Sequence, residues 1–324
     1  MEFLNFLGLD IGFGDTKAVM VNEDFKVVKS VSFPTLIAQH VPTPITEEED
    51  GVTTFTFGAG QYVVGEDART EPAYFTLVDM EDLKKYAPLL FQAVCCFLEV
   101  EDPLPVCASL PPGWWQHRHE FRKILSSILK EQNLVIVAPQ GMGTYLVVKE
   151  ENLLPCEEGL FLLLDFGYNT VDYLLIEDMK GRFRFPRGDT WSRIGITKLI
   201  EFFKEELPEG LGDLSERAVR LMLQNGGGKI YGEFKFLEGE KRRAEERYSE
   251  ALKQKLKANL GEIWKETDAI ILTGGGTHYF STENFRFHKN VIIPEVPEIA
   301  NAKGQAILLA QKSKERGKDE LQRR

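Results

Sequence analysis

The chain lacks cysteine clusters and long apolar runs. Its four cysteines show neither metal-ligand spacing nor a disulfide framework, so we expect reduced core thiols. No apolar run approaches the roughly 20 residues that cross a bilayer. The N-terminal segment also lacks the basic start and cleavage site of a signal peptide. These absences predict a soluble cytoplasmic protein without a membrane partner; the cysteines are Cys95, Cys96, Cys107 and Cys156.

An excess of positive charge is also missing, because the formal net charge is −11. A broad nucleic-acid footprint requires many Lys and Arg contacts, so direct nucleic-acid binding is not expected. The sequence has 324 residues, of which 43% are hydrophobic. Such a chain can bury a sizeable core, and its length predicts about two domains.

Short apolar runs separated by turn residues occur in the same order twice. The pattern predicts strands at 3–11, 16–21 and 25–33, and again at 160–166, 170–176 and 182–185. Aligning Asp10 with Asp165 also aligns Gly12 with Gly167 and Phe13 with Tyr168. The sequence therefore predicts an internal duplication of an α/β unit.

Helical and strand patterns follow each of these sets. In the first half we expect helices at 79–98 and 116–130 and strands at 104–110 and 134–138. In the second half we expect helices at 195–206, 214–224 and 242–264 and a strand at 269–273. Residues 38–51 are expected to form an exposed acidic loop, and 312–324 a frayed basic helical end.

The Gly-containing turns that end the first strand of each set are the main chemical candidates. The commoner phosphate motifs are absent: no P-loop is present, and the first turn leads into a strand, unlike a dinucleotide fingerprint. Successive backbone N–H groups in a tight turn can nevertheless bind an anion, and a glycine lets a phosphate approach closely. The candidate phosphate-binding residues are Gly12, Phe13, Gly14, Asp15, Thr16 and Lys17, and Gly167, Tyr168, Asn169 and Thr170.

One carboxylate precedes each turn. Asp10 and Asp165 are suited to hold a hydrated Mg²⁺ beside the phosphates, although a single Asp in this position commonly only stabilises the turn. A third glycine cluster follows the strand at 269–273. Its flat backbone could lie against a purine and ribose, or it could be an ordinary loop; its members are Gly274, Gly275, Gly276 and Thr277.

Together these segments resemble the two phosphate motifs and the adenosine motif of the actin, Hsp70 and sugar-kinase superfamily. Pro139–Tyr145 and Ala300–Ala306 look like its two connecting motifs, and all five occur in the family's order. The compact length and the run from Asp165 to Asp172 look most like bacterial and archaeal actin-like proteins of the ParM type. Phe13, Asp15 and Asn169 depart from the family pattern.

The resemblance implies duplicated RNase H-like (actin-like) domains flanking a nucleotide cleft, namely 1–146 with 299–324, and 147–298. It further implies ATP or ADP with Mg²⁺ as cofactors, Gln140 orienting the attacking water and Asp165 assisting. By the same resemblance, the protein would polymerise into dynamic filaments on ATP binding, for plasmid segregation or another cytoskeletal role. Its partners would be further copies of itself and a DNA-binding adaptor protein.

Two alternatives remain open from the sequence. A small-molecule kinase of the same fold would need a carboxylate base, for which Glu66, Asp67 and Glu71 are candidates. A nucleotide-regulated, chaperone-like binding protein would need an appended peptide-binding domain.

Overall fold

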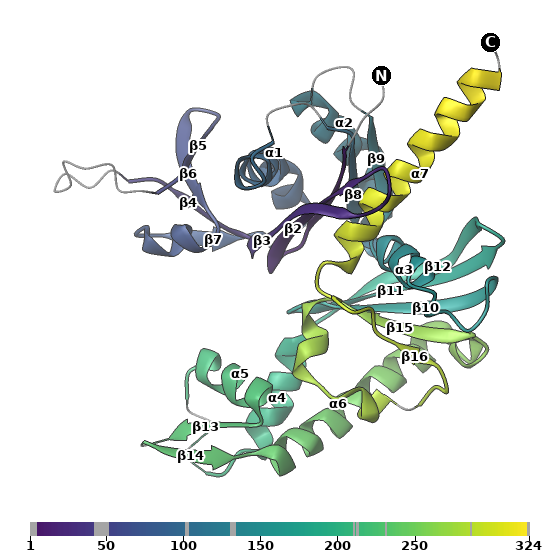
Figure 1. Cartoon of the computed structure of the whole chain (residues 1–324). Coiled ribbons are helices and arrows are strands. Elements are labelled where there is room, and N and C mark those ends of the chain that lie inside the picture. Colours follow the sequence, from purple (N-terminus) through teal and green to yellow (C-terminus); the bar gives the residue numbers. More distant parts are fainter. Residues whose placement is uncertain are drawn as a thin grey trace. The chain divides into compact units, whose positions relative to one another are not determined.

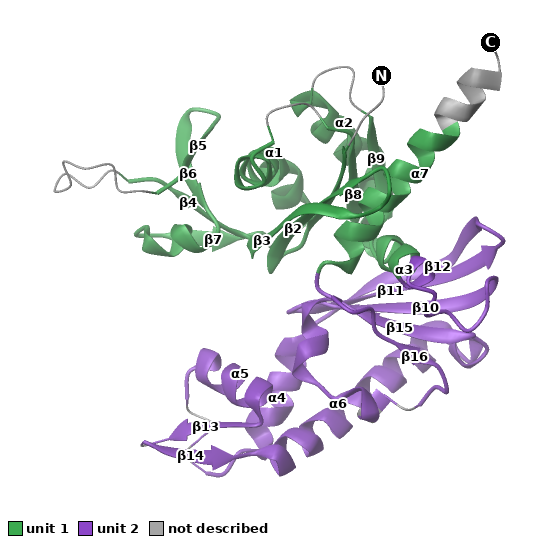
Figure 2. Cartoon of the chain, viewed as in Figure 1, with its two compact units in different colours: residues 1–147, 299–324 green, residues 148–298 purple. Residues whose placement is uncertain are grey.

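The computed structural model describes residues 5–41, 52–100, 104–129, 134–209, 211, 214–230, 232–285 and 287–322. Two compact units make up the chain: unit 1 comprises Met1–Val147 with Ile299–Arg324, and unit 2 comprises Val148–Glu298 (Figure 2). No helix of the described residues is long and apolar enough to cross a membrane.

Unit 1 is built on a five-stranded sheet (Figure 1). Strand β1 pairs antiparallel with β2, which pairs antiparallel with β3, and β8 and β9 continue parallel to β1. The sheet order is therefore β3-β2-β1-β8-β9. The bounds are β1 Asn5–Ile11, β2 Asp15–Asn22, β3 Val27–Pro34, β8 Val106–Leu110 and β9 Val135–Pro139.

Alternate side chains of this sheet pack against different helices, as the two-residue period of a strand requires. Leu7 and Leu9 of β1 lie in the core with α1 (Met80–Phe97) and α2 (Arg118–Ile128). Phe6 lies in a separate cluster with the alanines of α7 (Ala300–Gln322). The sheet is thus covered by helices on both faces.

Helix α7 approaches its neighbours so closely that only glycine fits at the contacts. A Cβ on Gly8 would lie 1.8 Å from the carbonyl oxygen of Ala302. A Cβ on Gly304 would lie 1.8 Å from the carbonyl oxygen of Gly143, in α3 (Met142–Glu150). These glycines bring the two connecting segments identified in the sequence together within unit 1.

A second, four-stranded sheet lies between β3 and α1 in the chain. Its order is β5-β6-β4-β7, and every pair in it is antiparallel. The predicted exposed loop at 38–51 is wrong at its start, because Ala38 and Gln39 belong to this sheet, and residues 42–51 lie outside the described part. The bounds are β4 Leu36–Gln39, β5 Thr54–Phe57, β6 Gly60–Val64 and β7 Tyr74–Thr76, with the short helix η1 at Glu66–Thr70.

Unit 2 repeats the topology of unit 1. Its sheet has the order β12-β11-β10-β15-β16, with β10 to β12 antiparallel and β15 and β16 parallel to β10. Because order and directions match those of unit 1, the predicted duplication is confirmed. The bounds are β10 Gly159–Phe166, β11 Thr170–Met179, β12 Arg182–Ser192, β15 Ala269–Thr273 and β16 Val291–Ile292.

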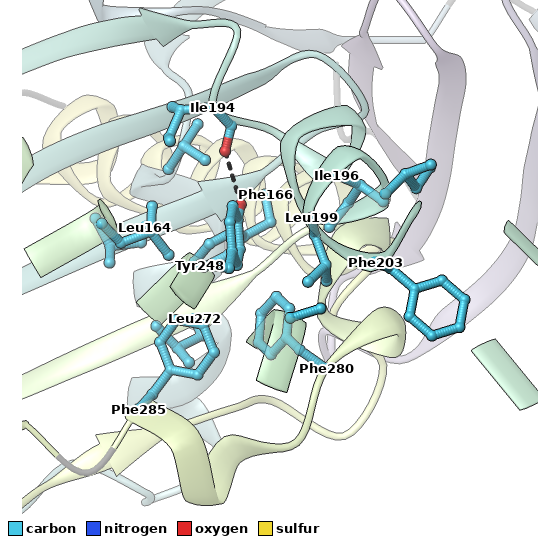
Figure 3. Close-up of a cluster of buried hydrophobic side chains, with 14 of the residues drawn as sticks. Leu164, Phe166, Ile194, Ile196, Leu199, Phe203, Tyr248, Leu272, Phe280 and Phe285 are labelled. Atoms are coloured by element: carbon cyan, nitrogen blue, oxygen red, sulfur yellow. Dashed lines mark hydrogen bonds between the residues drawn. The ribbon is translucent and has the colours of Figure 1, made fainter. Parts of the chain in front are cut away.

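The core of unit 2 forms where α4 (Ile196–Glu206) and α6 (Glu238–Leu260) meet the sheet (Figure 3). Tyr248 of α6 is buried among Phe166, Phe280 and Phe285, and its hydroxyl donates to the carbonyl of Ile194 at 2.7 Å. Burial raises the pKa of Tyr248, so the hydroxyl stays protonated as a donor. Helix α5 (Glu216–Asn225) and the hairpin of β13 (Gly227–Ile230) and β14 (Glu233–Phe236) follow α4.

Several predicted boundaries are wrong for local reasons. The long helix of unit 2 ends at Leu260 and not at 264, because Gly261 takes a φ of 62°. The predicted helix at 116–130 begins only at Arg118, after the short helix η2 (Pro112–His117). By contrast, the segment 312–324 was predicted to be a helical end, and it does continue α7 as far as Gln322. All four cysteines are free, but Cys96 is exposed, so not every thiol lies in the core as predicted.

Candidate functional site

In unit 1, three polar residues gather where parallel strands end. Asp10 lies near the end of β1, Ser109 near the end of β8, and Gln140 directly follows β9. The Ser109 hydroxyl donates to Asp10 Oδ1 at 2.6 Å, and the Gln140 N–H donates to the carbonyl of Leu110 at 2.7 Å. Open α/β sheets bind ligands outside the carboxyl ends of their strands. The fold therefore brings Asp10 and Gln140 to the edge where a ligand is expected.

The first turn is held so that part of its backbone stays available. The Gly12 N–H donates to the carbonyl of Asp15 at 3.0 Å, and the Thr35 hydroxyl and N–H donate to the carbonyls of Gly12 and Gly14, each at 2.8 Å. Within the described residues, the amides of Phe13 and Gly14 have no hydrogen-bond partner. Two successive unpaired N–H groups in a tight turn form a concavity that suits an anion.

Two side chains of this turn, those of Phe13 and Thr16, are engaged by the protein itself. The Phe13 ring packs edge-on against Trp114, with ring centroids 5.1 Å apart. The Thr16 hydroxyl is buried and lies 2.9 Å from that of Thr35. Asp15 is exposed, and Lys17 lies opposite Asp10 in the β1–β2 ladder. The bulky Phe13 thus anchors the turn, and the backbone is left to contact the ligand.

The second turn, in unit 2, has the same backbone design. The Gly167 N–H donates to the carbonyl of Thr170 at 2.9 Å, just as Gly12 bonds to Asp15. The amides of Tyr168 and Asn169 have no hydrogen-bond partner in the described part of the chain. Each predicted turn therefore offers two successive free N–H groups at equivalent positions.

The start of α4 fixes the carbonyl side of this second turn. The Thr197 N–H donates to the carbonyl of Tyr168 at 2.9 Å, and the Arg193 N–H donates to that of Asn169 at 2.9 Å. Gly195 fits between them because any Cβ there would lie 2.6 Å from the Tyr168 carbonyl oxygen. The carbonyls of the turn thus accept hydrogen bonds from the backbone at the start of α4, whereas the amides of the turn make none of these bonds.

The exposed side chain of Tyr168 makes one polar contact of its own. Its hydroxyl donates to the Glu216 carboxylate, in the first turn of α5. This bond ties the second turn to α5. Tyr168 and Phe13, which the sequence alignment made equivalent, therefore both anchor their turns to neighbouring helical segments.

The third glycine cluster lies beside the second turn. Thr273, which ends β15, is paired with Asp165 of β10. Gly274 has a φ of 88°, and a Cβ there would lie 2.3 Å from Asp165 Oδ1. A Cβ on Gly276 would lie 2.7 Å from the Phe166 carbonyl oxygen, whereas one on Gly275 would meet open space. Gly275 is thus the member of the cluster whose surface is free for a ligand.

Thr277, also predicted to bind the nucleotide, is buried, and its hydroxyl donates to the carbonyl of Gly274 at 2.8 Å. Its side chain therefore closes the glycine loop. Unit 2 brings together Asp165, the second turn and the glycine cluster at the carboxyl ends of β10 and β15.

A buried polar network in unit 1 was missed as a site by the sequence interpretation. In the orientation that satisfies its hydrogen bonds, the Gln305 amide donates to the carbonyls of Leu9 at 2.9 Å and Cys107 at 3.1 Å. Its oxygen lies 3.1 Å from Asn301 Nδ2 and 3.0 Å from the Ser109 hydroxyl. Because Ser109 has a single hydroxyl proton, it donates to either Gln305 or Asp10 at any one time.

The same network reaches the segment that carries Gln140. Asn301 Oδ1 accepts from the Gly141 N–H at 3.0 Å, directly after Gln140. Polar residues four positions apart in the Ala- and Gly-rich start of α7 were the signal for this network. Asn301 and Gln305 thereby position the backbone around Asp10 and Gln140.

Taken within its own unit, each of the two aspartates suits a hydrated divalent cation better than a closed metal site. Among the described residues, no group of three or more His, Cys, Asp or Glu side chains could hold a metal ion. Mg²⁺ is commonly held by one or two carboxylates, several waters and substrate phosphates. Asp10 and Asp165 are each mostly buried beside one turn, so the residues present fit that arrangement.

Of the candidate kinase bases, two already have side-chain partners within unit 1. Glu66 pairs with Arg69 at 2.8 Å, and Glu71 pairs with His40 at 2.7 Å and also accepts from the Val41 N–H at 3.1 Å. Both carboxylates are thus held by neighbouring side chains of unit 1.

Two family models match the chain in sequence. Residues 8–150 match the N-terminal domain of actin-like proteins, and residues 163–283 match the C-terminal domain of the archaeal actin homologue, MreB-like. The chain belongs to the actin-like proteins. The suspected family and the duplicated α/β fold are confirmed.

Solved structures show that this actin-like fold extends over nearly the whole chain. A ParM filament from Clostridium botulinum is 18% identical, with a TM-score of 0.67, and the match covers 95% of this chain and 99% of that one. An archaeal actin homologue in complex with ADP is 18% identical, with a TM-score of 0.74 and coverage of 94% and 99%. ParM from Bacillus thuringiensis with ATP is 15% identical, with a TM-score of 0.63 and coverage of 96% and 99%. A search of curated proteins finds no match to this actin-like chain.

Proposed function

We propose that this protein is a cytoplasmic ATPase that binds ATP with Mg²⁺ and polymerises into filaments. The observation that carries the proposal is the matched pair of turns, each with two successive amides that lack a partner in the described chain. One such turn is a weak signal. Two at equivalent positions in a duplicated fold suit the phosphates of a single nucleotide.

The remaining predicted residues take roles around that nucleotide. Gly12, Gly14 and Gly167 allow the phosphates to approach the backbone, and Gly275 offers the surface for the nucleoside. Mg²⁺, held through water by Asp10 and Asp165, offsets the negative charge of the phosphates. Lys17 adds a positive charge near the first turn.

Hydrolysis requires a water molecule in line with the γ-phosphate. Gln140 follows β9 at the ligand-binding edge of unit 1, and Asn301 holds the adjoining Gly141 amide. A Gln side chain is not an efficient base, so we assign Gln140 the role of orienting the water, with Asp165 assisting. The two units would each act as one actin-like domain.

Polymerisation is supported by the fold and by its solved neighbours. The match to the C. botulinum ParM filament covers nearly the whole of both chains. We propose plasmid or other DNA segregation as the task, or another cytoskeletal role. The net charge of −11 suits cargo that is attached through a separate basic adaptor protein.

Asp165→Ala and Gln140→Ala test the site assignment. Each is expected to lower ATP turnover at least about a hundredfold, as loss of a group that handles the reacting proton or water does. Circular dichroism and thermal melts should show that both variants are folded. Undiminished turnover by folded Asp165→Ala protein would refute the assignment.

A further inference from the structure

The hairpin of β13 and β14 presents an aromatic surface in unit 2. All four residues of β14 are exposed, and Phe236 is 81% and Phe234 50% accessible. Being two residues apart, they share one face of the strand, and their ring centroids lie 5.0 Å apart. Exposed aromatic surface of this kind commonly marks an interaction site.

The hairpin is held firmly enough to present this surface. Ile230, the last residue of β13 beside the hairpin turn, and Leu237, which directly follows β14, are both buried in the core of unit 2. The Leu237 N–H also donates to the carbonyl of Gly226 at 2.8 Å. Figure 1 shows the hairpin beside α5, at the end of unit 2 away from the β10–β16 sheet.

The charge of the hairpin is opposite to that of the whole chain. Lys229 is exposed and pairs with Phe234 across the hairpin, so it lies on the same face as the aromatic rings. Lys235 is exposed on the opposite face, and the two lysines outnumber the one acidic residue of the two strands, Glu233, whereas the chain carries −11. A basic aromatic surface on an acidic protein is complementary to acidic, apolar surface on another copy.

Unit 2 carries such a surface just before β10. In the segment 150–158, Leu153 is 44% accessible and Pro155 is also exposed. Glu157 and Glu158 are exposed beside them. This acidic segment thus offers apolar contact for the aromatic rings and carboxylates for Lys229, which shares their face.

The hairpin and the acidic segment are associated with opposite ends of β10. The acidic segment leads into β10 at Gly159. Tyr168 lies just beyond the other end of β10 and bonds to Glu216 at the start of α5. Helix α5 in turn leads into the hairpin. The eight residues of β10 alone separate these ends by about 25 Å. Two surfaces that are complementary but distant on one chain cannot satisfy each other within that chain.

We propose that the hairpin of one copy docks against the acidic segment 150–158 of the next, which rests on the proposed self-assembly. Such a contact is heterologous, because different patches meet. Repeated heterologous contacts that do not close into a ring generate an open filament. The contact would therefore join copies head to tail along unit 2.

Charge reversal on each side tests the pairing. Lys229→Glu with Lys235→Glu, and Glu157→Lys with Glu158→Lys, are each expected to raise the critical concentration for ATP-dependent sedimentation by about tenfold or more, because like charges then meet. Mixing the two variants should restore mixed polymer at a concentration where neither sediments alone. Phe236→Ser should raise the critical concentration in the same way as a charge reversal on one side of the contact. Phe185→Ser, at an aromatic of unit 2 that is 40% accessible, is the matched control and should sediment normally.

The outcomes separate this inference from the proposed function. Binding of a fluorescent ATP analogue should stay unchanged in every variant, since none lies in a phosphate-binding turn. Normal sedimentation of both reversed variants would overturn the hairpin contact and leave self-assembly standing, with the hairpin available to a different partner. Failure of the unaltered protein to sediment would instead overturn self-assembly, and the contact with it.

Discussion

The glycine cluster that follows β15 allows folding and nucleotide binding to be tested separately. Gly274 and Gly275 are adjacent, yet a Cβ on Gly274 would lie 2.3 Å from Asp165 Oδ1, and one on Gly275 would meet nothing within 4 Å. Gly274 also has a φ of 88° and a ψ of 162°, a conformation available essentially to glycine alone.

Gly274→Ala is therefore expected to destabilise the protein. The backbone conformation costs about 1–3 kcal/mol and the steric overlap a further 1–3 kcal/mol or so, giving a loss of about 2–6 kcal/mol. Gly275→Ala, with open space around the new methyl group, should change the free energy of unfolding by no more than about 0.5 kcal/mol. Urea unfolding followed by circular dichroism measures both.

Nucleotide binding should show the complementary sensitivity at Gly275. A methyl group on its open surface would separate the nucleoside from the backbone, and about 1.4 kcal/mol of lost contact weakens binding tenfold. We expect Gly275→Ala to raise the Kd for ATP by about that factor, measured by calorimetry on a fully folded protein. Unchanged affinity in that variant would refute the placement of the nucleoside, and undiminished stability of Gly274→Ala would refute the local packing.

Three further outcomes follow from the described contacts. Tyr168→Phe should cost about 0.5–1.5 kcal/mol, seen as a lower Tm, by removing the bond to Glu216, with ATP affinity retained because the turn amides remain; a large loss of affinity would show that the hydroxyl contacts the ligand. Gly304→Ala should cost at least about 1–3 kcal/mol in urea unfolding, because its methyl group would overlap the backbone of α3; wild-type stability would contradict that packing. Cys96 is exposed and should react with a thiol reagent in the native protein. Burial raises the pKa of Cys107 to about 12 and should protect its thiol from the reagent until the protein unfolds. Equal labelling rates for the two cysteines, measured by mass spectrometry, would contradict this.

The parts of the fold that local sequence determines were predicted well. Each candidate turn joins two strands that are adjacent in sequence, and an Asp followed two residues later by Gly marks the end of the first strand. The duplication was visible because both turns carry this mark. The glycine cluster follows a fully apolar strand, so its position at a strand end was also accessible to sequence interpretation.

The rest depends on contacts between distant segments. The β5–β6 hairpin is local, with alternating Thr and Phe in β5, and was missed in the sequence. Its sheet is completed by β4, which pairs with β6 and β7 across longer stretches of chain and leaves no local pattern. The β13–β14 hairpin was missed because Phe234 and Phe236 lie on an exposed face, where the apolar pattern does not reflect burial in a core. Ser109 meets Asp10 through the pairing of β8 with β1, and it meets Gln305 through the close approach of α7. Neither event leaves a local pattern.

Electron microscopy of the purified protein with and without ATP and Mg²⁺ tests the central claim most directly. The account predicts filaments with ATP and Mg²⁺ and none without nucleotide. It also predicts none for an Asp165→Ala variant in which further alanine or bulky substitutions at Gly12 and Gly167 have abolished ATP binding. Calorimetry on the same samples establishes whether ATP is bound. Protein that binds ATP but forms no filament at any concentration tested would contradict the claim.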